Sequence, residues 1–254
     1  MADKPAFMAH LVAAFPDWDT SLRVGEAMID GGAGLLEVQF PFSDPTADGP
    51  WIQRACADAL AAGFAVDDGF RLVDRLANRP GAPQVFVMVY ANLAFRPGIE
   101  PFLARCRDAG ARGVIVPDLP PDYDEGLYAA GRNLALEVVP VVPVTARAER
   151  LRTVVESSRT GSLYTALRKG VTGGYTRISD DSVRFLRDAR ALGVSVMAGF
   201  GISERAQVDA LAPLVDTVIV GSAFIRALLE APEGADAYDT VRGLMARLAD
   251  PGTS

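Results

Sequence analysis

The sequence has little of the chemistry that builds disulfide frameworks or metal centres. It contains two cysteines, Cys56 and Cys106, and a single histidine, His10. Two cysteines cannot form the multi-bridge framework of small secreted domains, and these three residues are too few for a Cys/His zinc site. This scarcity fits a reducing cytoplasm, and we expect no metal. A Ser–His–Asp triad would have to use His10, and the sequence has no nucleophile motif to pair with it, which argues against such a triad.

Long apolar runs and excess positive charge are also missing. No stretch approaches the roughly 18 consecutive apolar residues that a membrane span requires, and the N-terminus lacks a signal-peptide pattern. The formal net charge is −7, and an acidic surface repels phosphate backbones and anionic lipid. The sequence therefore argues against nucleic acid and membranes as partners.

The chain has ample apolar material for a core. Its 254 residues are 50% hydrophobic and 22% charged. This length is near the roughly 250 residues of one (β/α)₈ barrel, and the composition excludes disorder as the main state. No linker or break in composition divides the chain, so we predict a single domain over residues 1–254.

Short apolar runs alternate with longer amphipathic segments, which predicts parallel strands covered by helices. We expect a closed (β/α)₈ barrel, because there are eight strand candidates and no G-x-G-x-x-G follows the first. The predicted strands are His10–Ala14, Leu35–Phe40, Gln84–Val89, Gly113–Val116, Glu137–Val142, Ser162–Ala166, Val194–Ala198 and Thr217–Val220. The predicted helices are Thr20–Asp30, Asp67–Ala77, Gly98–Asp108, Asp122–Arg132, Arg147–Ser157, Asp180–Ala191 and Glu204–Leu211.

The spacing of helix-to-strand junctions locates an insertion. Two strand–helix units separate Gly31 from Gly110, a span of 79 residues, and two separate Asn133 from Gly193, a span of 60 residues. The excess lies in residues 41–64, after the second predicted strand. Extra length in such a loop falls on the catalytic face of a barrel, so we expect an extended catalytic loop there.

Two acidic residues are candidate proton-transfer groups. Alternation along Leu35–Phe40 turns three apolar side chains toward the helices and aims Glu37 and Gln39 into the barrel. An inward carboxylate loses hydration, which raises its pKa toward a range useful for proton transfer. Asp48 follows in a loop restricted by proline and glycine. In the alternative interpretation, Glu37 pairs with an arginine, and Asp44 and Asp48 are turn residues.

Glycine-rich segments after the last two predicted strands are candidate phosphate sites. Gly199–Ser203 and Gly221–Phe224 let backbone N–H groups approach an anion, and Ser222 can cap the helix that begins near Ala223. In the alternative interpretation, the glycines of these two segments are ordinary turn residues. After the sixth strand, the basic, glycine-rich segment 168–174 resembles a mobile lid, or else a solvated surface loop. His10 and the two cysteines are expected to be packed, buried residues.

The block LLEVQFPFSDPTADGPWIQ, residues Leu35–Gln53, resembles the signature of the tryptophan synthase alpha chain family. The resemblance covers about Ala9 to Leu229. PFSDP followed by ADGP is its specific part, whereas the glycine motifs alone would fit many phosphate-binding barrels. Further motifs occur in family order, namely Val89–Asn92, Val116–Pro120, Arg168–Gly173, Gly199–Ser203 and Gly221–Ala223.

The resemblance implies a (β/α)₈ barrel that cleaves indole-3-glycerol phosphate into indole and glyceraldehyde 3-phosphate, in tryptophan biosynthesis, without metal or organic cofactor. Glu37 stands at the position of the general acid/base, and Asp48 at that of the carboxylate that holds the indole N–H and stabilises the cationic ring. Tyr164 matches an active-site tyrosine. The residues implied around the phosphate are Gly173, Gly201, Gly221 and Ser222.

The resemblance also implies a partner, a PLP-dependent tryptophan synthase beta chain that receives the indole. Asp44 lies in the loop that senses this partner, and we expect that loop and the lid to become ordered when substrate and partner bind. Departures from the family pattern are His10 in place of an aromatic residue, Gln39 and Phe40 where glycine and a small aliphatic residue are common, and Leu167 where serine often begins the lid.

Three rival functions remain open at this point. The first is a stand-alone indole-3-glycerol phosphate lyase of secondary metabolism, and the second is a catalytically weak, allosteric partner subunit. The third is another barrel acting on sugar phosphates, such as an isomerase. The presence of Glu37 and Asp48 argues against the second, and the specific PFSDP motif argues against the third.

Overall fold

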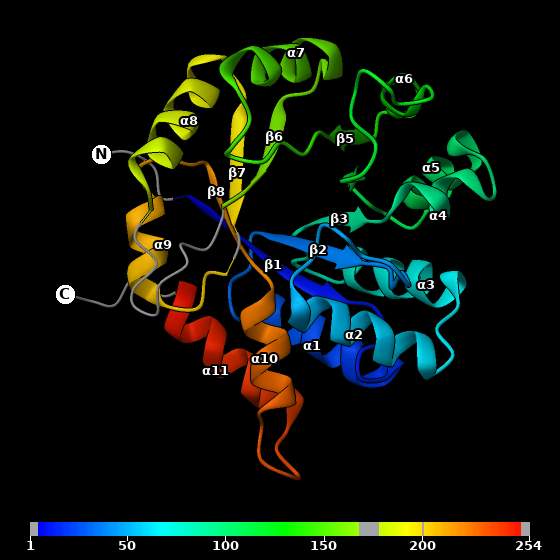
Figure 1. Ribbon diagram of the computed structural model, residues 1–254. Helices are drawn as coiled ribbons and strands as arrows, with labels where there is room; N and C mark the ends of the chain where they lie inside the picture. Colours follow the sequence, from blue (N-terminus) through cyan, green and yellow to red (C-terminus); the bar gives the residue numbers. More distant parts are fainter. Residues whose placement is uncertain (1–4, 168–177, 200, 250–254) are drawn as a thin grey trace.

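A closed parallel sheet forms the centre of the molecule. The computed structural model describes residues 5–167, 178–199 and 201–249 (Figure 1). Within them, eight parallel strands form one sheet in the order β5-β4-β3-β2-β1-β8-β7-β6. The strands are β1 (Ala6–Val12), β2 (Leu35–Gln39), β3 (Gln84–Met88), β4 (Gly113–Ile115), β5 (Glu137–Val139), β6 (Ser162–Ala166), β7 (Ser195–Gly199) and β8 (Thr217–Val220).

The junction between β5 and β6 closes this sheet into a barrel. Pro140 has no N–H to give to a ladder, and β5 ends just before it, three residues earlier than predicted. The chain then bridges to β6, because Val142 N–H donates to the Tyr164 carbonyl at 2.9 Å and Tyr164 N–H donates to the Pro140 carbonyl at 2.9 Å. The prediction of a (β/α)₈ barrel is confirmed.

Helices surround the strands on the outside of the barrel (Figure 1). Seven lie where the sequence predicts them, with ends shifted by one or two residues except at the start of α6. The described helices are α1 (Trp18–Asp30), α2 (Pro50–Ala61), α3 (Val66–Ala77), α4 (Ala91–Phe95), α5 (Ile99–Asp108), α6 (Leu127–Asn133), α7 (Ala148–Ser158), α8 (Asp180–Ala191), α9 (Arg205–Leu211), α10 (Ser222–Leu229) and α11 (Ala237–Ala249). No described helix is long and apolar enough to cross a membrane.

The predicted first strand, His10–Ala14, lies too late, since β1 is Ala6–Val12. Besides β5, two more predictions are wrong for identifiable reasons. The predicted helix from Asp122 begins only at Leu127, because the Asp124 carboxylate accepts hydrogen bonds from the N–H groups of Gly126 and Tyr128 and holds a turn there. The expected loop over residues 41–64 contains α2. That helix starts with proline at its first position, where the missing N–H costs nothing.

The core has an outer and an inner apolar layer. Leu36, Val38 and Phe40 belong to the outer layer, between the sheet and the helices, as the alternation of β2 predicts. The inner layer fills the barrel with side chains from different strands, namely Met8, Phe86, Met88, Tyr90, Ile115, Val139, Met197 and Ile219. Polar residues of β1 and β2 lie above this layer, at the carboxyl ends of the strands, and there the barrel opens into a pocket.

Candidate active site

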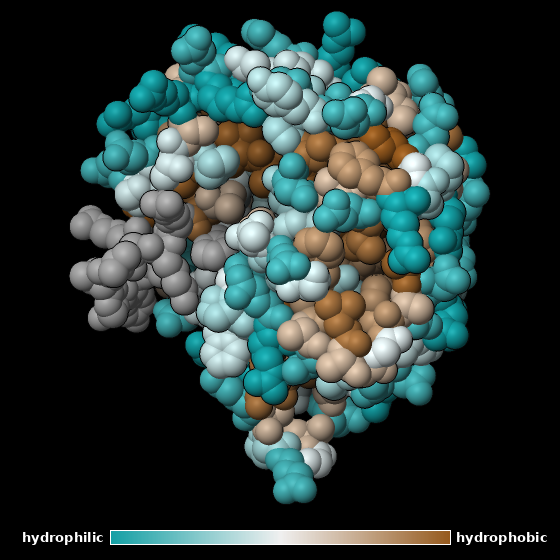
Figure 2. Space-filling view, turned by 45° about the vertical axis from the view of Figure 1, so that its right-hand side comes forward, coloured by the Kyte–Doolittle hydropathy of each residue, from teal (hydrophilic) through white to brown (hydrophobic). Residues whose placement is uncertain are grey.

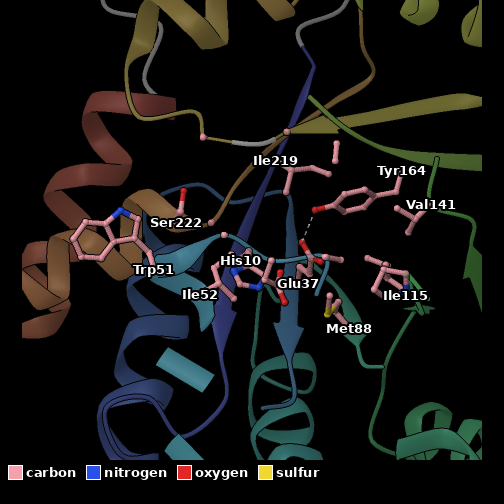
Figure 3. A pocket seen from close by; sticks show the side chains of 18 of the residues that line it. His10, Glu37, Trp51, Ile52, Met88, Ile115, Val141, Tyr164, Ile219 and Ser222 are labelled. Atoms are coloured by element: carbon pink, nitrogen blue, oxygen red, sulfur yellow. Dashed lines mark hydrogen bonds between the residues drawn. The ribbon is translucent and has the colours of Figure 1, made fainter. Parts of the chain in front are cut away.

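The pocket at the carboxyl ends of the strands collects residues from both halves of the chain. His10 comes from β1, Glu37 from β2 and Tyr164 from β6 (Figure 3). The loops after β2, β7 and β8 add Asp48, Gly199, Gly201, Gly221 and Ser222. Met88, Ile115 and Val141 form an apolar wall on the right of the view in Figure 3, and Ile52 lies on the other side, beside His10. A cavity with both polar and apolar lining suits an amphipathic ligand.

Glu37 is a buried carboxyl group with weak polar support. It is 2% exposed, and its hydrogen-bond partner among the described residues is the Tyr164 hydroxyl, which donates to Oε2 at 3.5 Å. Burial raises the pKa of the Glu37 carboxyl from its usual 4.5 to about 7, and the nearby Asp48 charge contributes to the rise. No ion pair within the described ranges joins Glu37 to an arginine. The inward orientation is therefore confirmed, and the arginine-paired alternative has no support among the described residues.

Asp48 is the second carboxyl group of the pocket and is held more firmly. Its Oδ2 atom accepts hydrogen bonds from Gln39 Nε2 at 2.7 Å and from the Tyr90 hydroxyl at 3.0 Å. The Tyr90 oxygen in turn accepts from the Ala47 N–H at 2.9 Å. Burial raises the pKa of Asp48 above its usual value, while these two hydrogen bonds act in the opposite direction. The loop thus fixes Asp48 in the pocket, so it is more than a turn residue.

Asp44 lies in the same loop but outside the pocket. Its side chain is exposed and accepts a hydrogen bond from the neighbouring Ser43 hydroxyl at 2.6 Å. The structure therefore separates Asp44 from Glu37 and Asp48 and leaves it accessible from outside.

Glycines border the pocket at the ends of β7 and β8. Gly201 has φ of 66°, a left-handed conformation that suits glycine. Gly221 precedes α10, and a Cβ atom there would lie 2.8 Å from His10 Nδ1, so a larger residue would displace the histidine. The first turn of α10 thus meets the pocket wall with its free N–H groups, a ready site for an anion. The predicted cap is wrong, because Gly221 holds the N-cap position and Ser222 is the first helical residue.

The structure brings together most of the candidate site residues. Six of them line one pocket, namely Glu37, Asp48, Tyr164, Gly201, Gly221 and Ser222. The predicted lid over residues 168–174, with Gly173, lies outside the described residues. Among the residues that are described, no group of three or more His, Cys, Asp or Glu side chains could hold a metal ion.

Sequence reasoning gave no role to three polar residues of the site, His10, Gln39 and Tyr90, although it aimed Gln39 into the barrel. His10 Nε2 lies 2.7 Å from Gln39 Oε1, and Gln39 continues the contact to Asp48, which Tyr90 also holds. The decisive feature is the strand register, which the sequence alone does not show: His10 pairs with Glu37 and therefore faces the same way. Cys56 and Cys106 are buried free thiols, as expected.

The fold and the pocket together define a class. A closed parallel barrel with carboxyl groups and glycine loops around a pocket at the carboxyl ends of its strands has the architecture of a (β/α)₈-barrel enzyme. The comparisons with known proteins identify the family within that class. The family model described as tryptophan synthase alpha chain matches residues 1–247.

Curated relatives and solved structures agree with this match. The tryptophan synthase alpha chain of Opitutus terrae is 39% identical over 90% of this chain and 85% of its own length, and that of Helicobacter hepaticus is 34% identical over 89% and 87%. A tryptophan synthase structure from Mycobacterium tuberculosis, in an aminoacrylate-bound form, has a TM-score of 0.85 at 32% identity, with 97% of this chain and 92% of that chain covered. A tryptophan synthase complex from Pyrococcus furiosus has a TM-score of 0.86 at 28% identity, covering 98% and 99%.

The chain belongs to the tryptophan synthase alpha chain family, whose members are lyases that cleave indole-3-glycerol phosphate.

Proposed function

We propose that this chain cleaves indole-3-glycerol phosphate by a retro-aldol reaction, with Glu37 as the acid/base group. The observation that carries the proposal is the position of Glu37, which is buried in the middle of β2 and lines the same pocket as Asp48. A pKa of about 7 lets Glu37 give up and take back a proton near neutral pH. Two carboxyl groups in unlike surroundings can take unlike roles.

The reaction needs two proton transfers on one face of the substrate. Protonated Glu37 delivers its proton to indole C3, and the ring becomes cationic. The Glu37 carboxylate then removes the proton from the hydroxyl on the carbon bonded to C3, the carbon–carbon bond breaks, and its electron pair returns to the ring. The products are indole and glyceraldehyde 3-phosphate. Asp48, held by Gln39 and Tyr90, accepts the indole N–H and stabilises the cationic ring.

The remaining pocket residues place the substrate. The apolar wall, which includes Met88, Ile115 and Val141, suits an indole ring, and the Tyr164 hydroxyl orients Glu37. Backbone N–H groups around Gly201 and at the start of α10 suit the phosphate. This mechanism uses side chains and backbone of the chain alone, so we propose that it needs no metal or organic cofactor.

We also propose that the chain works with a tryptophan synthase beta chain, to which indole passes. The Pyrococcus furiosus relative, whose fold this chain shares, is a tryptophan synthase complex. Asp44 is exposed on the loop that holds Asp48, and Trp51 is 37% exposed at the mouth of the pocket. Apolar residues also gather in patches on the face shown in Figure 2. A partner that covers this loop can act directly on the position of Asp48.

The same proposal includes one domain and a cytoplasmic location. One apolar cluster of the described residues runs from Phe7 to Leu248, which supports a single domain over residues 1–254. Two buried free thiols and the biosynthetic role of the family support the cytoplasm.

An indole-release assay tests the function. The purified chain is incubated with indole-3-glycerol phosphate, alone and with an added beta chain, and both products are measured. Indole and glyceraldehyde 3-phosphate should form in equal amounts. We expect slow release by the chain alone and faster release with the partner. A rate of indole release that is the same with and without the beta chain would favour the stand-alone lyase. No release under either condition would overturn the proposal.

A further inference from the structure

His10 occupies a central position in the pocket that the mechanism above leaves unused. The ring is 3% exposed and sits on β1, directly beside Glu37 in the strand register. Figure 3 shows it pointing into the pocket, between Ser222 and Glu37 in that view. One ring nitrogen, Nε2, faces Gln39, and the other, Nδ1, faces Gly221 at the start of α10. The histidine thus spans the distance from the carboxylates to the anion-binding end.

The hydrogen bonds around Gln39 fix which nitrogen of His10 carries the proton. Gln39 Nε2 donates to the Asp48 carboxylate at 2.7 Å, so the amide oxygen of Gln39 points the other way, toward His10. The reversed amide would place its oxygen against a carboxylate oxygen. An amide oxygen accepts and never donates, so His10 Nε2 must be the donor at 2.7 Å. In the neutral ring, Nδ1 is then a hydrogen-bond acceptor.

His10 Nδ1 has no partner among the described residues, although it is buried. Buried polar atoms without partners are uncommon in folded proteins and cost free energy, and this one borders a ligand pocket. The atom needs a donor. A phosphate dianion offers acceptors only, and the indole N–H is assigned to Asp48. The hydroxyl that reacts at Glu37 is also engaged, which leaves the hydroxyl on the middle carbon of the glycerol chain, next to the phosphate end where Gly221 lies.

We propose that His10 is a substrate-binding residue whose Nδ1 atom accepts a hydrogen bond from the middle hydroxyl of the glycerol phosphate chain. This inference rests on the proposed function, since it concerns the same substrate. Gln39 is a positioning residue for both groups, because its oxygen holds the imidazole and its amide nitrogen holds Asp48. His10 therefore selects a hydroxylated chain over a deoxygenated one.

The first test observes His10 in the unaltered protein. His10 is the only histidine, so ¹⁵N-histidine labelling reports on it alone. Two non-reacting probes are compared under the same mildly alkaline conditions. The probes are glycerol 3-phosphate and 3-hydroxypropyl phosphate, which lacks only the middle hydroxyl. We expect a proton on Nε2, and an Nδ1 resonance that moves in the direction of hydrogen-bond acceptance with the first probe only. A proton on Nδ1, or the same shift with both probes, overturns the proposal.

The second test measures binding of the same probes to His10→Phe, which keeps a ring of similar size. We expect binding of glycerol 3-phosphate to weaken about tenfold, the usual order for losing one buried hydrogen bond. Binding of 3-hydroxypropyl phosphate should change less than about twofold. An equal loss for both probes would show that His10 only supports the pocket. If the variant does not fold, the labelling measurement on the wild-type chain decides.

The wild-type activity separates the two possible failures. If the wild-type chain, with or without a beta chain, releases no indole from indole-3-glycerol phosphate, the proposed function fails. If it releases indole and the two probes behave alike, the function stands and only the role of His10 is wrong.

Discussion

Glu37 and Asp48 share one pocket but differ in their polar support. Asp48 accepts two hydrogen bonds, at 2.7 and 3.0 Å, both of which favour its charged form. Within the described part of the chain, Glu37 has only the Tyr164 hydroxyl at 3.5 Å, so burial dominates and its pKa rises to about 7. This difference in polar support agrees with the proposal that Glu37 exchanges a proton while Asp48 stays in a fixed position.

The first prediction concerns the activity of Glu37→Gln. Glutamine keeps the size of the side chain but cannot exchange a proton, and positioned acid–base groups contribute about 10²–10⁴-fold to rates. Indole release should fall by at least about a hundredfold, while binding of glycerol 3-phosphate stays within about twofold. A variant that kept more than about a tenth of the wild-type turnover would falsify the acid/base role.

The same variant should change how stability depends on pH. The pKa of Glu37 is raised from 4.5 in the unfolded chain to about 7 in the fold, so the folded state holds this proton more tightly. The stability that Glu37 contributes is complete below pH 4.5 and is lost as pH rises through about 7. Glutamine does not titrate, so the Glu37→Gln variant does not lose this stability as the pH rises. Relative to wild type, the variant should gain on the order of 3 kcal/mol of unfolding free energy between the two ends of this pH range.

Urea unfolding of both proteins, at a pH of about 5 and again at about 8, measures this difference. The comparison of two proteins at each pH cancels the titration of all other groups that the substitution leaves unchanged. An equal difference at both pH values would show that Glu37 has an ordinary pKa in the fold.

Asp48→Asn should affect turnover more than substrate affinity. The asparagine oxygen can still accept from Gln39 or Tyr90, so the loop should stay in place. The lost charge matters most when the ring is cationic, which lowers kcat rather than raising KM. Steady-state kinetics of indole release separate the two constants. An unchanged kcat with a raised KM would mean that Asp48 only binds substrate.

The sequence predicts that Glu37 points into the pocket, but it does not predict that His10 does. The period of two along β2 is geometric, so it aims Glu37 inward whatever surrounds it. The contact of His10 with Gln39 depends on the register between two strands, and one sequence does not show that register. A lone histidine in an apolar strand therefore looks, from the sequence, like a packed residue.

At the scale of elements, helix α10 and the glycine before it set the geometry of the proposed phosphate end. Gly221 has an ordinary negative φ of −130°, so its requirement for glycine comes from the close approach of His10 and not from backbone strain. Gly201, in contrast, has φ of 66° and is required by its backbone conformation. The two loops thus need glycine for different reasons.

Gly221→Ala should weaken binding of glycerol 3-phosphate about tenfold or more, because the new Cβ displaces His10 and the start of α10. Isothermal titration measures the affinity. Gly243→Ala on α11 is a matched control, since the nearest atom to its Cβ would be 3.6 Å away, and it should bind as wild type does. Unchanged binding in Gly221→Ala would place the phosphate elsewhere.

The ends of a helix are predictable where the hydrophobic period and the capping residues indicate the same boundary, as in α8. They are less predictable where these two signals indicate different boundaries. The start of α6 is predicted too early, because acidic residues that favour a first helical turn can equally hold a turn, as Asp124 does. Helix α2 is hidden in an insertion with the motifs of a loop, although Pro50 and the alanines after it are compatible with a helix.

At the scale of the whole molecule, we propose that the coupling to a partner depends on the segment between β2 and α2. Asp44 is exposed on it and Asp48 is held inside the pocket, so the segment connects the surface to the site within a few residues. Partner binding should therefore raise turnover, and by reciprocity substrate should tighten partner binding.

Hydrogen exchange with and without a beta chain measures this coupling. Exchange of the N–H groups from Asp44 to Asp48 should slow in the complex, while the buried strand β3 should show no change. Binding of a beta chain without effect on this exchange or on turnover would show that the segment is not the coupling element. The stand-alone lyase would then be the better description.

The position of β1 between β2 and β8 determines when the site can exist during synthesis. The first strand, β1, pairs with the last strand, β8. One edge of β1 in the nascent chain therefore stays unpaired until residues Thr217–Val220 have emerged from the ribosome. Glu37 on β2 and Asp48 in the loop after it then meet the proposed phosphate end at α10 only late in translation. A prematurely terminated chain therefore carries both carboxylates and no place for the phosphate.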